Sequence, residues 1–125
     1  MKEKILRLEN YQARSTVAGT SVNDVDVFSI VSDSQDAYVN YLRVVRGAVI
    51  QSYTMEIDKR MDEPDEELLS LAIVEIRRMF ASNAREILIP FPLDISLGEG
   101  IKLRVPTKSD KRQLVELSEK NARMA

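Results

Sequence analysis

Three consecutive stretches in the first half of the chain have the hydrophobic pattern of β-strands. Residues 25–32 (VDVFSIVS) are rich in β-branched and aromatic side chains and lead into the turn-forming run DSQD. Residues 37–45 and 48–57 have the same character and are joined only by Arg46 and Gly47. A two-residue connection that ends in glycine is typical of a β-hairpin, so we predict three antiparallel strands in a row.

Strict alternation along the third of these strands predicts two different faces. One face holds Val49, Gln51, Tyr53, Met55 and Ile57, and the other holds Ile50, Ser52, Thr54 and Glu56. We therefore expect one face of this strand to be more exposed to solvent than the other.

The hydrophobic spacing then becomes helical. Apolar residues recur at three- and four-residue intervals over residues 69–80, which predicts an amphipathic helix. Asp62 is the expected N-cap, Pro64 suits an early helical position, and the acidic residues that follow favour the positive helix start. Asn83 is the expected C-terminal stop.

Two more strands and a second helix complete the pattern. Residues 86–91 (EILIPF) predict a strand buried on both faces and limited by its prolines, and residues 101–105 (IKLRV) alternate as a strand should. Ser109 or Asp110 is the expected cap of a closing helix. Residues 1–23 are mostly polar or small, and we interpret them as a tail or linker.

The resulting order is β-β-β-α-β-β-α over residues 24–125, which we treat as one domain. Three antiparallel strands followed by a helix, two further strands and a C-terminal helix on a mixed sheet form the skeleton of a ribonuclease H-like α/β (α+β) fold. The pattern alone is equally compatible with a small α+β interaction domain.

Composition excludes several classes of chemistry. The 125 residues include no Cys and no His, so disulfides, thiolate nucleophiles, Ser-His-Asp triads and His- or Cys-ligated zinc are all absent. A net charge of −2 argues against nucleic-acid binding driven by bulk charge. No apolar run is long enough to span a membrane and the first residues are charged, so we expect a cytoplasmic protein without a membrane partner.

The residues themselves resemble the central region of the excinuclease UvrC family, whose members are the nuclease component of the bacterial excinuclease ABC system for nucleotide excision repair. The ordered features are the strand start at residues 24–27 (DVDV), the Arg46-Gly47 turn, the strand EILIP and the closing pattern that begins DKR at residues 110–112. The similarity runs from about Tyr11 to the end of the chain.

The resemblance implies a fragment that lies just before the catalytic ribonuclease H-like domain of a longer protein. None of the family's GIY-YIG, catalytic or helix-hairpin-helix motifs occurs here. Many relatives carry a helix between the last two strands, whereas this chain has only PLDISLGEG at that place. The pairing direction of residues 101–105 is therefore left open.

Ribonuclease H-like nucleases hold two divalent metals with three or four clustered carboxylates. One carboxylate should lie midway along the first strand, where Asp26 is the candidate, with Asp24 on the same face. Glu86, Asp94 and Glu75 are the other candidates, and nothing in the pattern directs them towards Asp26. We therefore predict no catalytic residue, no metal site and no cofactor, with ordinary strand-entry roles for Asp24 and Asp26; the alternative is that Asp26 is a metal ligand.

Charge is unevenly distributed along the chain. Residues 54–70 hold seven acidic and two basic side chains, whereas residues 101–125 hold seven basic and three acidic ones. Four cations flank the last strand and the start of the last helix, where side chains and helix N–H groups could both meet phosphate. These candidate DNA-binding residues are Arg104, Lys108, Lys111 and Arg112. A solvated basic face is the alternative interpretation.

Three hypotheses follow. The first is a structural, DNA-positioning module of the parent nuclease, inactive alone, whose partners through the parent are DNA, UvrB and the UvrA-loaded damage complex. The second is an active, metal-dependent nuclease of the ribonuclease H type. The third is a protein-interaction domain that does not contact DNA.

Overall fold

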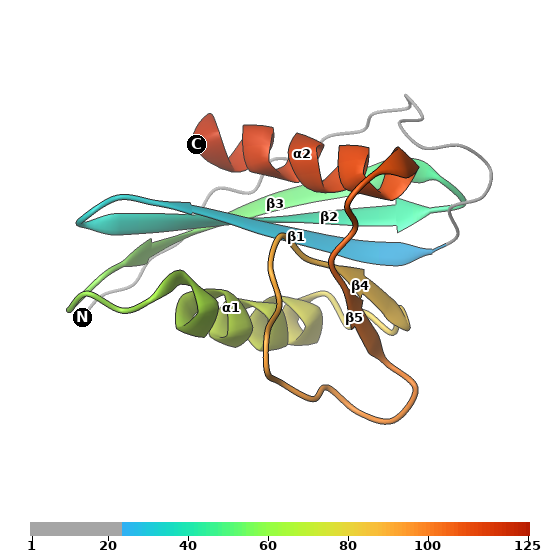
Figure 1. Cartoon of the computed structure of the whole chain (residues 1–125), viewed down its shortest axis with the longest axis horizontal. Helices are drawn as coiled ribbons and strands as arrows, with labels where there is room; N and C mark the ends of the chain where they lie inside the picture. Colours follow the sequence, from blue (N-terminus) through green and yellow to red (C-terminus); the bar gives the residue numbers. More distant parts are fainter. Residues whose placement is uncertain (1–23) are drawn as a thin grey trace.

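A five-stranded mixed sheet with one helix on each face forms the framework (Figure 1). The structure is a computed structural model that describes residues 24–125, and the predicted tail at residues 1–23 lies outside the described residues. The strand order is β3 (Ala48–Asp58), β2 (Asp36–Val45), β1 (Val25–Ser32), β4 (Glu86–Leu88) and β5 (Lys102–Arg104), so the first strand of the described residues is the central strand of the sheet. This arrangement confirms the predicted fold class.

The first three strands are an antiparallel meander: β1 (Val25–Ser32), β2 (Asp36–Val45) and β3 (Ala48–Asp58). Arg46 and Gly47 both have positive φ angles, 54° and 80°, which is the geometry of a type I′ turn. The predicted hairpin is therefore confirmed. At the opposite end, the Asp33 carboxylate accepts the N–H groups of Gln35 and Asp36, each at 2.8 Å, and closes the first turn.

A β-bulge changes the predicted faces of β3. Arg43 pairs with Gln51 but the next residue, Val44, pairs with Val49, so Ile50 is the extra residue and is half-exposed. An extra residue shifts the alternation by one position. Val49 consequently packs on the side of helix α2 (Ser109–Arg123), whereas Tyr53 packs on the side of helix α1 (Asp65–Met79). The predicted single face for these two residues was wrong.

Helix α1 (Asp65–Met79) lies across one face of the sheet. The predicted N-cap was wrong: Pro64 occupies that position, in extended conformation and without a side-chain cap, and Asp65 and its two acidic neighbours form the first turn. The helix ends earlier than Asn83 predicts, because Ala81 takes a left-handed conformation with φ of 51°.

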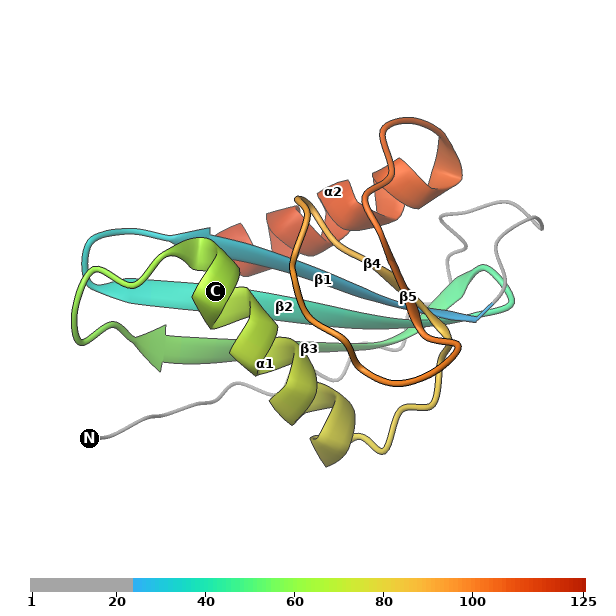
Figure 2. The same cartoon turned by 60° about the horizontal axis from the view of Figure 1, so that its bottom comes forward.

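The last two strands are short: β4 (Glu86–Leu88) and β5 (Lys102–Arg104). Both pair in parallel, β4 with β1 and β5 with β4, which settles the direction that the sequence left open. The connection between them contains no helix and passes on the same side of the sheet as α1 (Figure 2). Its apolar side chains, Phe91, Leu93, Leu97 and Ile101, pack against the α1-side core, where a crossover helix would otherwise lie.

Helix α2 (Ser109–Arg123) covers the opposite face of the sheet (Figure 1). Its N-cap is Lys108 rather than Ser109 or Asp110, and Ser109 begins the helix with φ of 85°. Leu114 and Val115 are fully buried against the aliphatic side chains of β1 and β2. No helix within residues 24–125 is long and apolar enough to cross a membrane.

Candidate functional site

Asp26 is the second of the eight residues of β1 and points to the α1 side of the sheet. The sequence placed it midway along the strand, but the structure places it at the amino end. Only 1% of its surface is exposed, so its carboxylate is withdrawn from solvent. A buried carboxylate requires partners, because removing an unpaired charge from water costs several kcal/mol.

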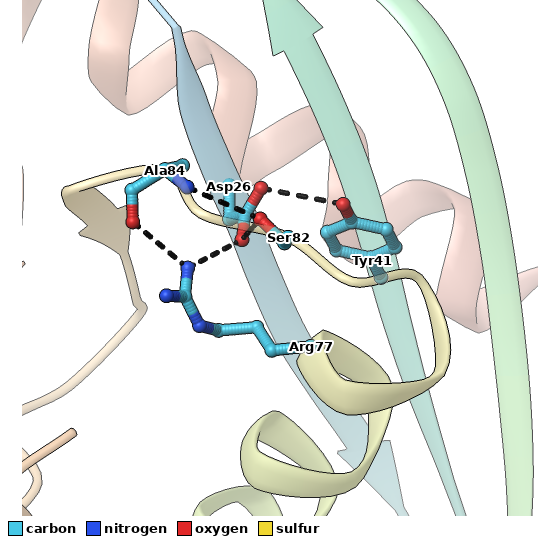
Figure 3. Close-up of polar contacts among 5 residues, drawn as sticks. All are labelled: Asp26, Tyr41, Arg77, Ser82 and Ala84. Carbon is cyan, nitrogen blue, oxygen red and sulfur yellow. Dashed lines mark hydrogen bonds and ion pairs between the residues drawn. The ribbon is translucent and has the colours of Figure 1, made fainter.

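Three side chains from three different elements supply those partners (Figure 3). Arg77, near the end of α1, donates from Nη1 to Asp26 Oδ2 at 2.8 Å. The Ser82 hydroxyl, in the loop after α1, donates to the same oxygen at 2.6 Å. The Tyr41 hydroxyl, on the neighbouring strand β2, donates to Oδ1 at 3.3 Å. Both carboxylate oxygens are therefore occupied.

The enclosure extends to the backbone of the loop that joins α1 to β4. Arg77 Nη1 also donates to the carbonyl oxygen of Ala84 at 3.0 Å, and the Ala84 N–H donates to the Ser82 hydroxyl oxygen at 3.3 Å. Burial and the nearby negative charge of Asp26 both raise the pKa of Tyr41 well above its ordinary value. Tyr41 is consequently a neutral hydrogen-bond donor at physiological pH.

Two of the other candidate carboxylates, Asp24 and Glu75, bond to partners other than Asp26. Asp24, which is exposed, accepts the backbone N–H of Arg46 at 3.1 Å. The half-exposed Glu75 carboxylate forms an ion pair with Arg78 at 2.8 Å. Within residues 24–125, no group of three or more carboxylates is close enough to hold a metal ion.

The structure gathers part of the predicted DNA-binding set around a single carboxylate, that of Glu86 at the start of β4. Lys111 Nζ lies 2.8 Å and Arg104 Nε 3.3 Å from Glu86 Oε2. Arg112 instead pairs with Glu116 along α2 at 3.1 Å. Lys108 is exposed and makes no ion pair or side-chain hydrogen bond within the described part of the chain.

The sequence pattern did not indicate Arg77, Ser82 and Tyr41 as partners of Asp26. One signal for Arg77 was available, since it lies four residues after the buried Ile73 and directly follows the buried Ile76. An arginine beside the apolar stripe of a helix is a candidate for a buried ion pair. No comparable local signal existed for Ser82 or Tyr41.

The sheet order, with antiparallel β1 to β3 and parallel β4 and β5 between two helices, defines a ribonuclease H-like domain. The family model described as the UvrC ribonuclease H-like domain matches residues 24–125. The chain therefore belongs to the UvrC ribonuclease H-like domain family.

Curated relatives agree with this assignment. The chain is 53% identical over 123 residues to UvrABC system protein C of Christiangramia forsetii and 50% identical over 123 residues to that of Flavobacterium johnsoniae, covering 98% of this chain and 20% of each relative. It is 46% identical to UvrABC system protein C of Porphyromonas gingivalis, covering 96% of this chain and 20% of that relative. The chain thus spans about a fifth of the length of these relatives. No solved structure is significantly similar to it.

Proposed function

We propose that this chain is a non-catalytic module of a UvrC nuclease, which helps to position damaged DNA while other parts of the same protein cut it. The observation that carries the proposal is the enclosure of Asp26. Strand β1 supplies one inward carboxylate, that of Asp26. The Arg77 guanidinium pairs with it and takes the position that a metal cation would need.

Two-metal cleavage requires several carboxylates around one point, because each divalent ion needs multiple oxygen ligands. Here Asp26 has both oxygens engaged, and Asp24, Glu75 and Glu86 each bond elsewhere. The guanidinium of Arg77 would also repel a metal ion at this place. These contacts support a structural role for Asp26 rather than a catalytic one.

The DNA-positioning role is supported by the cations at the start of α2 and the end of β5. Arg104, Lys108 and Lys111 come from neighbouring parts of the fold and lie near the N-terminus of α2. Helix N–H groups and cationic side chains at such a place are both suited to phosphate. Glu86 neutralises part of this positive charge, so we expect this surface to bind DNA with modest affinity.

The relatives named UvrABC system protein C suggest the setting in which the module works. We propose that the parent protein acts in the cytoplasm in nucleotide excision repair, with UvrB and the UvrA-loaded damage complex as its partners. In this proposal the module itself needs no metal or cofactor.

A plasmid-nicking assay tests the non-catalytic role. Incubating the 125-residue chain with supercoiled plasmid and Mg²⁺ or Mn²⁺ should give no more nicks than buffer alone. Metal-dependent nicking that is lost in Asp26→Asn would overturn the proposal and favour an active ribonuclease H-like nuclease. Metal-dependent nicking that persists in Asp26→Asn and co-elutes with the chain in gel filtration would also overturn the non-catalytic role.

Duplex binding tests the positioning role. We expect salt-dependent binding that the double variant Lys108→Ala, Lys111→Ala weakens by about tenfold, since two phosphate contacts are lost. The matched control is Lys120→Ala with Arg123→Ala, which removes the same charge from the far end of α2. Absent or salt-insensitive binding would instead favour a protein-interaction domain.

A further inference from the structure

A pocket of about 530 Å³ opens where β1 and β4 begin and β2 ends. Three short segments line it: residues 24–26, residues 43–46 and residues 82–85. They belong to the start of β1, the end of β2 with the first residue of the hairpin turn, and the loop between α1 and β4. Its volume is in the range of pockets that bind small molecules or parts of larger ligands.

The pocket has a surplus of positive charge. Arg43, Arg46 and Arg85 line it, and their side chains form no ion pair or hydrogen bond within residues 24–125. The opposing carboxylates are those of Asp24 and Asp26. Asp26 is already neutralised by Arg77, which leaves three guanidinium groups against the single carboxylate of Asp24.

The position of Arg43 shows why this surplus exists. Arg43 lies directly opposite Asp26 in the antiparallel pair of β1 and β2, so the two side chains share one face of the sheet. An ion pair between them would be the ordinary outcome. Arg77, Ser82 and Tyr41 occupy both oxygens of Asp26 instead, and Arg43 is left for another anion.

Arg46 is held by the backbone rather than by its side chain. It lies in the type I′ turn with φ of 54°, and its N–H donates to Asp24 Oδ1 at 3.1 Å. This contact fixes the turn and engages the carboxylate of Asp24. A fixed turn reduces the entropy that Arg46 would lose on binding a ligand.

We propose that this pocket binds a phosphate group of a DNA strand. Guanidinium groups present planar pairs of donors that match phosphate oxygens, and three of them around one pocket suit an anion that is contacted from more than one side. None of the described residues that line the pocket is aromatic, which favours the backbone over stacked bases. The DNA source of this phosphate rests on the positioning role proposed above.

The pocket is separate from the basic residues predicted from the sequence. Those cations lie around Glu86 and the start of α2. The arginines of the pocket are Arg43, Arg46 and Arg85, so the two sets adjoin at the start of β4 but have no residue in common. This separation allows each to be tested without the other.

The test compares two probes, inorganic pyrophosphate and a short DNA duplex, by NMR amide shifts and by affinity. The double variant Arg43→Gln, Arg85→Gln removes two guanidinium groups without changing a buried core residue. Its matched control is Arg60→Gln with Arg123→Gln, which removes the same charge from exposed positions outside the pocket. Thermal unfolding of each variant establishes that it is folded.

We expect both probes to shift the amides of residues 82–85 and the hairpin turn, and to compete with each other. The pocket variant should lose about tenfold in affinity for both probes, and its salt slope for DNA should fall by about 1. The control variant should bind as the unmodified chain does.

Unchanged affinity in the pocket variant, or pyrophosphate-induced amide shifts confined to the start of α2, would overturn the proposal that the pocket binds phosphate. The positioning role would remain intact. Pyrophosphate binding in the pocket by a chain that does not bind DNA would support the phosphate site and refute the positioning role. The two proposals therefore fail by different results.

Discussion

Arg77 and Asp26 are 51 residues apart in sequence and 2.8 Å apart in the fold, with 10% and 1% of their side chains exposed. The pair connects the last turn of α1 to the amino end of the central strand. Because Arg77 also bonds the Ala84 carbonyl oxygen, one guanidinium fixes the helix, the strand and the loop before β4 in a single arrangement.

Removing the guanidinium should be costly. In Arg77→Leu the buried Asp26 carboxylate keeps its two hydroxyl partners but loses its countercharge, and we expect a loss of about 3 kcal/mol in the free energy of unfolding. Urea unfolding followed by circular dichroism measures this loss. The neighbouring Arg78→Leu, which breaks only the exposed pair with Glu75, should cost less than about 1 kcal/mol.

The single variant Asp26→Asn and the double variant Asp26→Asn, Arg77→Leu complete the cycle. Neutralising the carboxylate removes the uncompensated charge, so part of the stability lost in Arg77→Leu should return. Equal stability of Arg77→Leu and Arg78→Leu would show that the enclosed pair does not hold the fold together.

The decrease in the free energy of unfolding at alkaline pH should depend on Tyr41. Its raised pKa means that the unfolded chain releases this proton at a lower pH than the folded chain does. The folded state then binds more protons above pH 10, and the contribution of Tyr41 should lower the free energy of unfolding with a slope that approaches about 1.4 kcal/mol per pH unit as the unfolded tyrosine becomes fully ionised. Tyr41→Phe should remove this component.

Urea unfolding at several pH values between 8 and 11 measures the slope. Tyr38→Phe is the comparison, since Tyr38 is much less buried although burial raises its pKa as well. We expect a smaller change of slope in that variant. An unchanged slope in Tyr41→Phe would contradict the prediction.

A polar layer lies beneath α2, centred on Ser118. Its hydroxyl contacts the Ser29 hydroxyl at 2.7 Å and the Asn40 side-chain oxygen at 2.9 Å, and Asn40 in turn donates to Thr54 at 2.9 Å. Ser118→Ala should cost about 1–3 kcal/mol, because it leaves buried polar atoms without a partner. Chemical denaturation measures this loss of stability, with the exposed Gln113→Ala as control. Equal stability of the two variants would contradict the prediction.

Glu86 should limit DNA affinity at the start of α2. Glu86→Gln releases Lys111 and Arg104 from their shared carboxylate, so duplex affinity at low salt should rise by about threefold or more. Stability should change by less than about 1 kcal/mol, since these pairs are partly exposed. Fluorescence anisotropy checks the affinity, and an unchanged value would argue against this surface as a DNA contact.

Much of the fold follows from local sequence. The bounds of β1, the Arg46-Gly47 hairpin and the helical spacing before Phe80 are all set by neighbouring residues, and the structure confirms them. The caps at Asp62 and Ser109 were predicted wrongly, because backbone conformation at a helix start depends on how the preceding loop packs. The family resemblance, based on ordered short patterns, is also confirmed.

The candidate site followed from the sequence only in part. Asp26 was identified as the notable carboxylate, but its three partners come from residues 41, 77 and 82, and no local pattern relates such distant positions. The pocket beside it was equally hidden, because only the fold brings residues 24–26, 43–46 and 82–85 together.

The sequence by itself determined which segments become strands and helices, because periodicity and turn residues act over a few positions. Tertiary structure decided the parallel pairing of β4 and β5 and the burial of Asp26. Those features arise where segments far apart in sequence compete for the same contacts, and such competition is resolved only when the whole chain packs.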